Sequence, residues 1–196
     1  MTTMKKLYII RHGESEANID SSIYFFKNDS EIELTSNGIQ QARICGKSLV
    51  NRLGQNKECC IFHSPYRRAK DTADLIDSEF VLAGIYGEII EEPLIHERIW
   101  GELNYIVDTP RLDRKVHFNF FYKPVEGESF SDGYQRIVLF FQQLQFAKDS
   151  LPDNIIIVSH GEAIRLMIMY LKKYSIEYFT DNRTNPKNGE ILEFEF

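Results

Sequence analysis

Two histidines in this chain each follow an apolar run and precede a glycine. His12 comes after the run at 7–10, and His160 comes after the β-branched run at 154–159. In a neutral imidazole, one ring nitrogen carries a proton and the other does not. The unprotonated nitrogen is free to act as a nucleophile near neutral pH. Transfer of a phosphoryl group is one reaction that suits such a nucleophile, provided that fixed donors meet the charge on the phosphoryl oxygens.

The donors and the proton source that this chemistry requires also have candidates. Arg11 directly precedes His12, and Arg68 lies about one turn into a helix expected after Ser64-Pro65. A guanidinium group binds two oxygens at once and keeps its charge, which suits a phosphoryl group. The leaving alkoxide needs a proton from a nearby acid, and Glu97 is the candidate for that role. Other carboxylates near it are Glu91, Glu92 and Glu102.

The elements that must position these residues follow from the hydrophobic pattern. Short apolar runs predict strands, and segments with apolar side chains every three or four residues predict helices. Their alternation predicts an α/β fold, a three-layer α/β/α sandwich with a largely parallel central sheet. The strands are expected at 5–10, 59–63, 88–91, 154–159 and 191–196, the last at an edge, and the helices at about 36–53, 66–76, 131–146 and 163–174.

Polar residues follow three of these predicted strands, at 11–13, 63–65 and 159–161. Crossover connections bring the carboxyl ends of parallel strands to one edge of the sheet, which is where ligands bind. We therefore expect two imidazoles and two guanidinium groups to surround a single tetrahedral anion. The first predicted helix starts after an N-cap at Thr35 or Ser36 and stops at Gly54. Its apolar residues have an imperfect helical spacing, and they are Ile39, Ala42, Ile44, Leu49 and Leu53.

Composition narrows the classes of function. The 196 residues carry a net charge of −6, which argues against a general nucleic-acid binder, and 14 Phe with 10 Tyr argue against disorder. No apolar run reaches the length of a signal peptide or a membrane span, so we expect a cytoplasmic protein without a membrane partner. The cysteines lack metal-ligand spacing and are expected to be buried free thiols in a reducing compartment; they are Cys45, Cys59 and Cys60. We expect one domain over 1–196 with a lid-like insertion around 94–127. We also expect a small phosphorylated substrate and no metal or other cofactor. The sequence leaves the oligomeric state open.

Six blocks of sequence, in order from residue 7 to about 165, resemble the histidine phosphatase, or phosphoglycerate mutase-like, superfamily. They read LYIIRHGESEAN, LTSNGIQQA, SPYRRAKDTA, IHERIWG, GES and VSHGEAIR, and FNFFYKPVEGES at 118–129 resembles the small phosphoglycerate-mutase-like phosphatases. The resemblance implies that His12 becomes phosphorylated and that Glu97 is the acid and base. It also implies a set of groups around the phosphoryl oxygens: Arg11, Asn18, Arg68, His160 and the backbone amide of Gly161.

The same resemblance leaves three functions to separate. Mutases of the superfamily carry extra basic residues after the catalytic glutamate, whereas the stretch 100–110 has no Lys or Arg, so we predict hydrolysis of phosphate monoesters. Phosphoglycerate mutase-type transfer stays an alternative because Arg111, Arg114 and Lys115 follow that stretch. A non-catalytic module that binds a phosphorylated ligand is the third hypothesis, although such a module usually lacks one of the pocket residues, which are all present here.

Several other residues are expected to have structural roles. Arg67 is predicted to lie at the surface, because only one of two neighbouring helical residues can point into a pocket. The aromatic segment 118–122 is predicted to belong to the core, and Asp132 with Arg136 to form a pair on one helix face. His63 is expected to be structural, and the rim or lid is expected to hold His96, Trp100 and His117.

Overall fold

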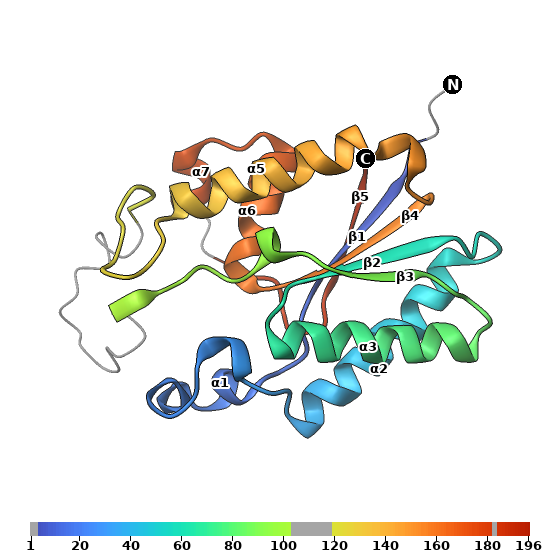
Figure 1. Ribbon diagram of the computed structural model, residues 1–196, viewed down its shortest axis with the longest axis horizontal. Coiled ribbons are helices and arrows are strands. Elements are labelled where there is room, and N and C mark those ends of the chain that lie inside the picture. The colour runs from blue at the N-terminus through green and yellow to red at the C-terminus, as the bar shows by residue number, and fades with distance from the viewer. Residues whose placement is uncertain (1–3, 103–118, 182–183) are drawn as a thin grey trace.

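A five-stranded sheet forms the centre of the computed structural model, which describes residues 4–102, 119–181 and 184–196 (Figure 1). The strand order is β3-β2-β4-β1-β5, and every neighbouring pair is parallel except β1 and β5. The sheet is therefore largely parallel and β5 lies at its edge, both as predicted, and the structure adds that β5 is antiparallel. The strands are β1 (Lys6–Arg11), β2 (Cys59–His63), β3 (Glu88–Glu91), β4 (Asn154–Ser159) and β5 (Ile191–Glu195).

Helices cover both faces of this sheet (Figure 1). On one face lie α2 (Ser36–Leu53) and α3 (Arg67–Leu82), and on the other lie α5 (Phe130–Phe146), α6 (Gly161–Lys172) and α7 (Ile176–Asp181). The predicted three-layer α/β/α sandwich is confirmed. Shorter elements are α1 (Glu16–Ile19) and the 3₁₀ helices Ser21–Phe25, Asp29–Glu31, Pro93–Ile95 and Lys148–Ser150.

The buried strand β1 contributes side chains to two separate hydrophobic cores. Successive side chains of a strand point to opposite faces, so alternate residues of β1 pack on different helices. Leu7 and Ile9 belong to the core under α5 and α6, whereas Tyr8 and Ile10 belong to the core under α2 and α3. All four are fully buried, which explains why the strand reads as an unbroken apolar run.

The caps of α2 are those that the sequence predicts, and its buried face leaves out two of its apolar residues. Thr35 accepts a hydrogen bond from the amide of Gly38, and Gly54 ends the helix at a φ of +59°. Ile39 and Ile44 are 41% and 66% exposed, so the two side chains that make the apolar spacing imperfect do not face the core. The buried stripe repeats at intervals of three and four residues, and these two side chains fall outside it. Its members are Gly38, Ala42, Cys45, Gly46, Leu49 and Leu53.

The turn after β1 presses against the start of α2. A Cβ atom on Gly38 would lie 2.0 Å from the carbonyl oxygen of Glu14, and one on Gly13 would lie 2.3 Å from the carbonyl oxygen of Gly38. Only glycine allows two backbones to approach this closely. These two glycines therefore fix the path of the chain directly after His12.

Much of the insertion predicted at 94–127 lies outside the described residues, which omit 103–118. His117, Phe118 and the basic residues at 111, 114 and 115 belong to that range. Within the described part of the aromatic segment, Phe120 is buried and Phe121 is 66% exposed. The predicted core position of this segment is therefore correct for Phe120 and wrong for Phe121.

Candidate active site

The two predicted imidazoles lie side by side at the carboxyl edge of the sheet. Arg11 pairs with Ser159 in the register of β1 and β4, so the residues that follow these strands lie at the same level. The amide of His12 donates to the carbonyl of Ser159 at 2.9 Å, which extends the pairing past the strand end. The ring centroids of His12 and His160 are 5.1 Å apart, with 59° between the ring planes.

The hydrogen bonds of His12 define which ring nitrogen carries the proton. Nδ1 lies 2.7 Å from the carbonyl oxygen of Gly13, and Nε of Arg68 lies 3.3 Å from Nε2. A carbonyl oxygen accepts only, so Nδ1 must hold the proton, and Nε2 is left as an acceptor that the Arg68 N–H faces. His12 therefore presents an unprotonated Nε2 to the site.

Both buried histidines are held in the neutral form. Burial, followed by the charge of Arg68, lowers the pKa of His12 well below its usual value of 6.5. The same two causes, in the same order, lower the pKa of His160 well below 6.5. Neutral imidazole is the form in which His12 can act as a nucleophile.

Ser64 holds His160 and was not identified from the sequence. The Ser64 hydroxyl lies 2.7 Å from Nε2 of His160, and Ser64 is fully buried. Nδ1 of His160 is buried and has no hydrogen-bond partner among the described residues. Tyr66 packs edge-on against the His160 ring, with centroids 5.1 Å apart. Both residues lie in the SPYRR block that contains Arg68, so their positions in that block were the available signal.

Arg11 and Arg68 have different partners. Nη1 of Arg11 donates to the carbonyl of Pro186 at 2.8 Å, and its Nε is buried without a hydrogen-bond partner in the described ranges. Nη1 of Arg68 donates to the carbonyl of Asp29 at 2.5 Å and lies 2.8 Å from the carboxylate Oδ1 of the same residue. Asp29 was not identified from the sequence, because no motif marks it and its contact depends on the path of the loop at 20–33.

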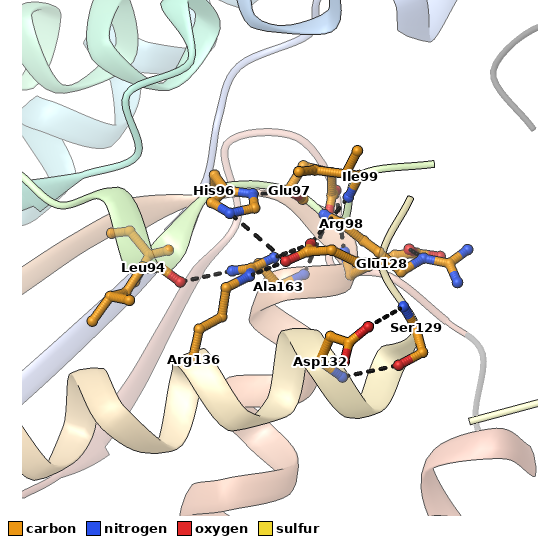
Figure 2. Close-up of polar contacts among 12 residues, drawn as sticks. Leu94, His96, Glu97, Arg98, Ile99, Glu128, Ser129, Asp132, Arg136 and Ala163 are labelled. Carbon is orange, nitrogen blue, oxygen red and sulfur yellow. Dashed lines mark hydrogen bonds and ion pairs between the residues drawn. The ribbon is translucent and has the colours of Figure 1, made fainter. Parts of the chain in front are cut away.

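Glu97 lies at the N-terminus of α6, where its carboxylate meets backbone amides (Figure 2). Oε1 accepts from the amides of Arg98 and Ala163 at 3.0 and 3.2 Å, and Oε2 accepts from the amide of Glu162 at 3.3 Å. The first amides of a helix have no partners within the helix and attract anions. The charge of Glu97 raises the pKa of Arg11 against the larger lowering by burial, so the two groups interact electrostatically.

Asn18 is linked to His12 through Asn188, whereas Gly161 directly follows His160. Oδ1 of Asn18 accepts from the amide and hydroxyl of Ser15 and from Nδ2 of Asn188. The same Nδ2 donates to the carbonyl of His12 at 3.1 Å, so Asn188 joins Asn18 to the chain at His12. Gly161 is the first residue of α6, directly after His160.

A buried ion pair supports the segment that carries Glu97. Nε of Arg98 donates to Oε2 of Glu162 at 2.9 Å, and the Arg98 side chain is fully buried. Its guanidinium group lies over the rings of Trp100 and Phe130, with 3.9 and 4.0 Å to the centroids. Burial raises the pKa of Glu162 to about 7, although Arg98 opposes that shift.

Several of the residues with predicted structural roles can be placed. The Arg67 side chain is 54% exposed and pairs with Glu33, so its predicted surface position is confirmed. His63 is buried, with Nδ1 2.8 Å from the carbonyl oxygen of Ser64. His96 lies at the rim of the site, where its ring stacks on Tyr66.

The predicted pair of Asp132 and Arg136 is wrong. Asp132 accepts from the amide of Ser129 in an N-terminal capping box of α5 (Figure 2). Arg136 instead forms a bidentate ion pair with Glu128 and donates to the carbonyl of Leu94. These contacts fasten the segment before Glu97 to α5.

Among the described residues, the structure has neither a cluster suited to a metal ion nor a helix suited to a membrane. No group of three or more His, Cys, Asp and Glu side chains suited to a metal ion occurs among residues 4–102, 119–181 and 184–196. In the same ranges, no helix combines the length and the apolar character needed to cross a bilayer. Cys45, Cys59 and Cys60 are buried free thiols, as predicted.

Comparison with known proteins supports the resemblance found in the sequence. The model of the histidine phosphatase superfamily (branch 1) matches residues 7–196. The phosphoglycerate mutase-like protein AT74 of Arabidopsis thaliana is 32% identical over 207 residues, which cover 97% of this chain and 65% of that protein. A 2,3-bisphosphoglycerate-dependent phosphoglycerate mutase of Cytophaga hutchinsonii is 30% identical over 183 residues, covering 89% of this chain and 80% of the relative.

Solved structures show the same fold. The mycobacterial glucosyl-3-phosphoglycerate phosphatase in complex with VO3 superposes with a TM-score of 0.76 at 19% identity, covering 96% of this chain and 90% of that one. At this level of identity the similarity concerns the fold alone. The chain spans about two thirds of the length of the Arabidopsis relative.

We predict that the buried Arg98–Glu162 pair contributes strongly to stability. Arg98→Met leaves a buried carboxylate without its cation and should lower the free energy of unfolding by about 3–5 kcal/mol. The loss should be larger at pH 8 than at pH 6, because the isolated Glu162 carboxyl, with its raised pKa, takes up a proton as the pH falls. Chemical denaturation at the two pH values measures both effects.

The exposed pair of Arg52 and Glu193 provides the matched control. Its side chains are 40% and 43% exposed, so Arg52→Met should cost at most about 1 kcal/mol. The double variant Arg98→Met/Glu162→Gln should recover part of the stability, because no buried charge is left unpaired. A double variant no more stable than Arg98→Met would contradict this account of the pair.

Proposed function

The chain belongs to the histidine phosphatase superfamily, and from this premise we propose that it hydrolyses phosphate monoesters through a phosphohistidine intermediate on His12. The observation that carries the proposal is the unprotonated Nε2 of His12, which faces Nε of Arg68 at 3.3 Å beside the ring of His160. A neutral nucleophile among fixed cationic and polar donors is what phosphoryl transfer requires. We propose a small phosphorylated molecule as the substrate.

In the first step Nε2 of His12 attacks phosphorus, and the bond from phosphorus to the ester oxygen breaks. Glu97 gives its proton to the departing oxygen, so the alcohol leaves uncharged. In the second step water attacks the phosphohistidine while the Glu97 carboxylate takes a proton from that water. The phosphorus–nitrogen bond breaks, which leaves Nε2 of His12 unprotonated again and releases inorganic phosphate.

The charge that develops on the phosphoryl oxygens needs donors that are already in place. We assign this role to Arg11, Arg68 and His160, with the amide of Gly161 and the carboxamide of Asn18 as further donors. Two observations support the assignment. Nδ1 of His160 and Nε of Arg11 are both buried without hydrogen-bond partners among the described residues. Buried polar groups are normally paired, so unpaired ones beside the nucleophile are consistent with donors or acceptors kept for a ligand.

The guanidinium groups also bear on the question of a metal ion. Two permanent charges beside the nucleophile neutralise phosphoryl oxygens without a metal. We therefore propose that the reaction needs no metal or other cofactor. A cytoplasmic location, expected from the three free thiols, stays a prediction.

Transfer to a second substrate is the alternative reaction, since relatives named as mutases match the chain. We favour hydrolysis because the sequence at 100–110 has no basic residue that would hold the carboxylate of a phosphoglycerate. Phosphate release from an aryl phosphate, measured beside mutase turnover with a bisphosphoglycerate primer, separates the two. We expect hydrolysis to exceed transfer by at least about tenfold, and faster transfer would favour the mutase.

The nucleophile is tested by substitution of His12. His12→Asn keeps an N–H donor for the carbonyl of Gly13 but removes Nε2, so turnover should fall by about three orders of magnitude or more. Brief incubation with a labelled phosphomonoester should leave acid-labile label on the unsubstituted protein and none on the variant. His63→Asn, at the end of β2, should keep both label and turnover. Near-normal activity of His12→Asn would show that the mechanism is wrong.

The acid is tested by its dependence on the leaving group. Glu97→Gln removes the proton that an alkoxide needs, so hydrolysis of alkyl phosphates should fall by about 10²–10³-fold. Aryl phosphates leave with little protonation and should lose less than about tenfold. Glu91→Gln, an exposed carboxylate at the end of β3, is the matched control and should leave both rates unchanged. Equal losses on the two ester classes would exclude Glu97 as the acid.

A further inference from the structure

The guanidinium group of Arg68 already forms an ion pair with an internal anion. Its Nη1 lies 2.8 Å from Oδ1 of Asp29 and donates to the backbone carbonyl of the same residue. The two side chains are only 4% and 13% exposed, so this contact is shielded from water. The Nε of the same guanidinium faces Nε2 of His12, so the carboxylate lies directly beside the candidate phosphoryl site.

The loop between Glu16 and Glu33 positions Asp29 beside Arg68. The amide of Glu16 donates to the carbonyl of Glu33 at 3.0 Å, and the amide of Glu33 donates to Oε2 of Glu16 at 3.2 Å. Between these ends, Lys27 adds an ion pair to Glu16 at 2.8 Å. Asp29 begins the 3₁₀ helix Asp29–Glu31 within the loop. Its position thus follows from contacts that bind the two ends of the loop together.

The positive charge of Arg68 already has a partner without a ligand. Arg11 and Arg68 supply two positive charges, and the Asp29 carboxylate, 2.8 Å from Nη1 of Arg68, offsets one of them. Tyr24 adds no charge, because burial and then the charge of Asp29 raise the pKa of its hydroxyl to about 12. A phosphoryl group that binds beside Asp29 places its negative charge next to a shielded carboxylate, which is unfavourable. Exchange of the Asp29 carboxylate for the phosphoryl oxygens removes this repulsion and keeps an anionic partner for Arg68.

Resting on the proposed function, we propose that the Asp29 carboxylate is an internal competitor for Arg68 that the phosphoryl group of the substrate must displace. Asp29 then sets the affinity of the site for phosphate: it weakens binding of the inorganic phosphate product and speeds its release. Arg68 stays in place when the carboxylate leaves, since the backbone carbonyl of Asp29 still accepts from Nη1.

The substitution Asp29→Asn isolates this effect. Asparagine keeps the shape of the side chain and the backbone bond to Arg68, and removes only the charge. Isothermal titration with orthovanadate and with inorganic phosphate measures the affinity without turnover. We expect Asp29→Asn to bind both anions about tenfold more tightly than the unsubstituted protein, equivalent to about 1.4 kcal/mol. In steady-state assays inorganic phosphate should become a stronger competitive inhibitor by a similar factor.

Two controls separate the local effect from a general change in charge. Glu31→Gln removes one negative charge from the same 3₁₀ helix at an exposed position and should leave the affinity unchanged. In an Arg68→Gln background, Asp29→Asn should no longer tighten binding, because no guanidinium group is freed. Asp29→Ser serves the same purpose if circular dichroism shows that Asp29→Asn is not folded.

The outcomes distinguish this inference from the proposed function. Equal or weaker anion binding by Asp29→Asn, with hydrolysis by the unsubstituted protein intact, overturns the inference and leaves the function standing. Weaker binding would mean that Asp29 serves to orient Arg68. Absence of anion binding from both proteins, together with absence of hydrolysis, overturns both. Tighter binding that depends on Arg68 supports the competitor.

Discussion

The hydrogen bond from Nδ1 of His12 to the carbonyl of Gly13 is the interaction on which the candidate site depends. It fixes the tautomer, because a carbonyl oxygen can only accept, and so leaves Nε2 without a proton. That bond requires the tight turn after β1, which in turn requires the close approach of Gly13 and Gly38. Burial and the charge of Arg68 then keep the ring neutral. A different turn at Gly13 would leave the same residues present without a defined nucleophile.

The parallel sheet brings the other groups to this nitrogen. Pairing of β1 with β4 sets His12 and His160 at one level, and the start of α6 directly after His160 gives Glu97 two backbone amides to bind. The protein as a whole is acidic, yet the site contains two guanidinium groups beside the histidines. Local arrangement and burial, more than net charge, decide which ligand such a pocket attracts. The Asp29 carboxylate already pairs with Arg68, which is why it matters to the affinity for an anion.

Much of the fold was predictable because strong local signals agree with the final packing. The bounds of β2 and β4 match their apolar runs, and Thr35 and Gly54 mark the ends of α2. The imperfect apolar spacing in α2 mixes two faces of the helix, and Ile39 and Ile44 lie on the exposed one. The positions of His12, Arg11, Arg68 and His160 followed from the strand ends and the resemblance. Ser64 and Asp29 were missed, since their contacts join residues 96 and 39 positions apart and depend on the exact path of loops.

The protonation state of His12 tests the central claim most directly. Nitrogen-15 NMR of the protein labelled in its histidine rings, with His12→Asn for assignment, reports the tautomer and the charge of the ring as the pH falls. A lowered pKa keeps the imidazole neutral at and below pH 6.5. We predict a His12 ring protonated at Nδ1, with Nε2 unprotonated, that stays neutral well below pH 6.5. A ring protonated at Nε2, or one that becomes charged near pH 6.5, would contradict the account.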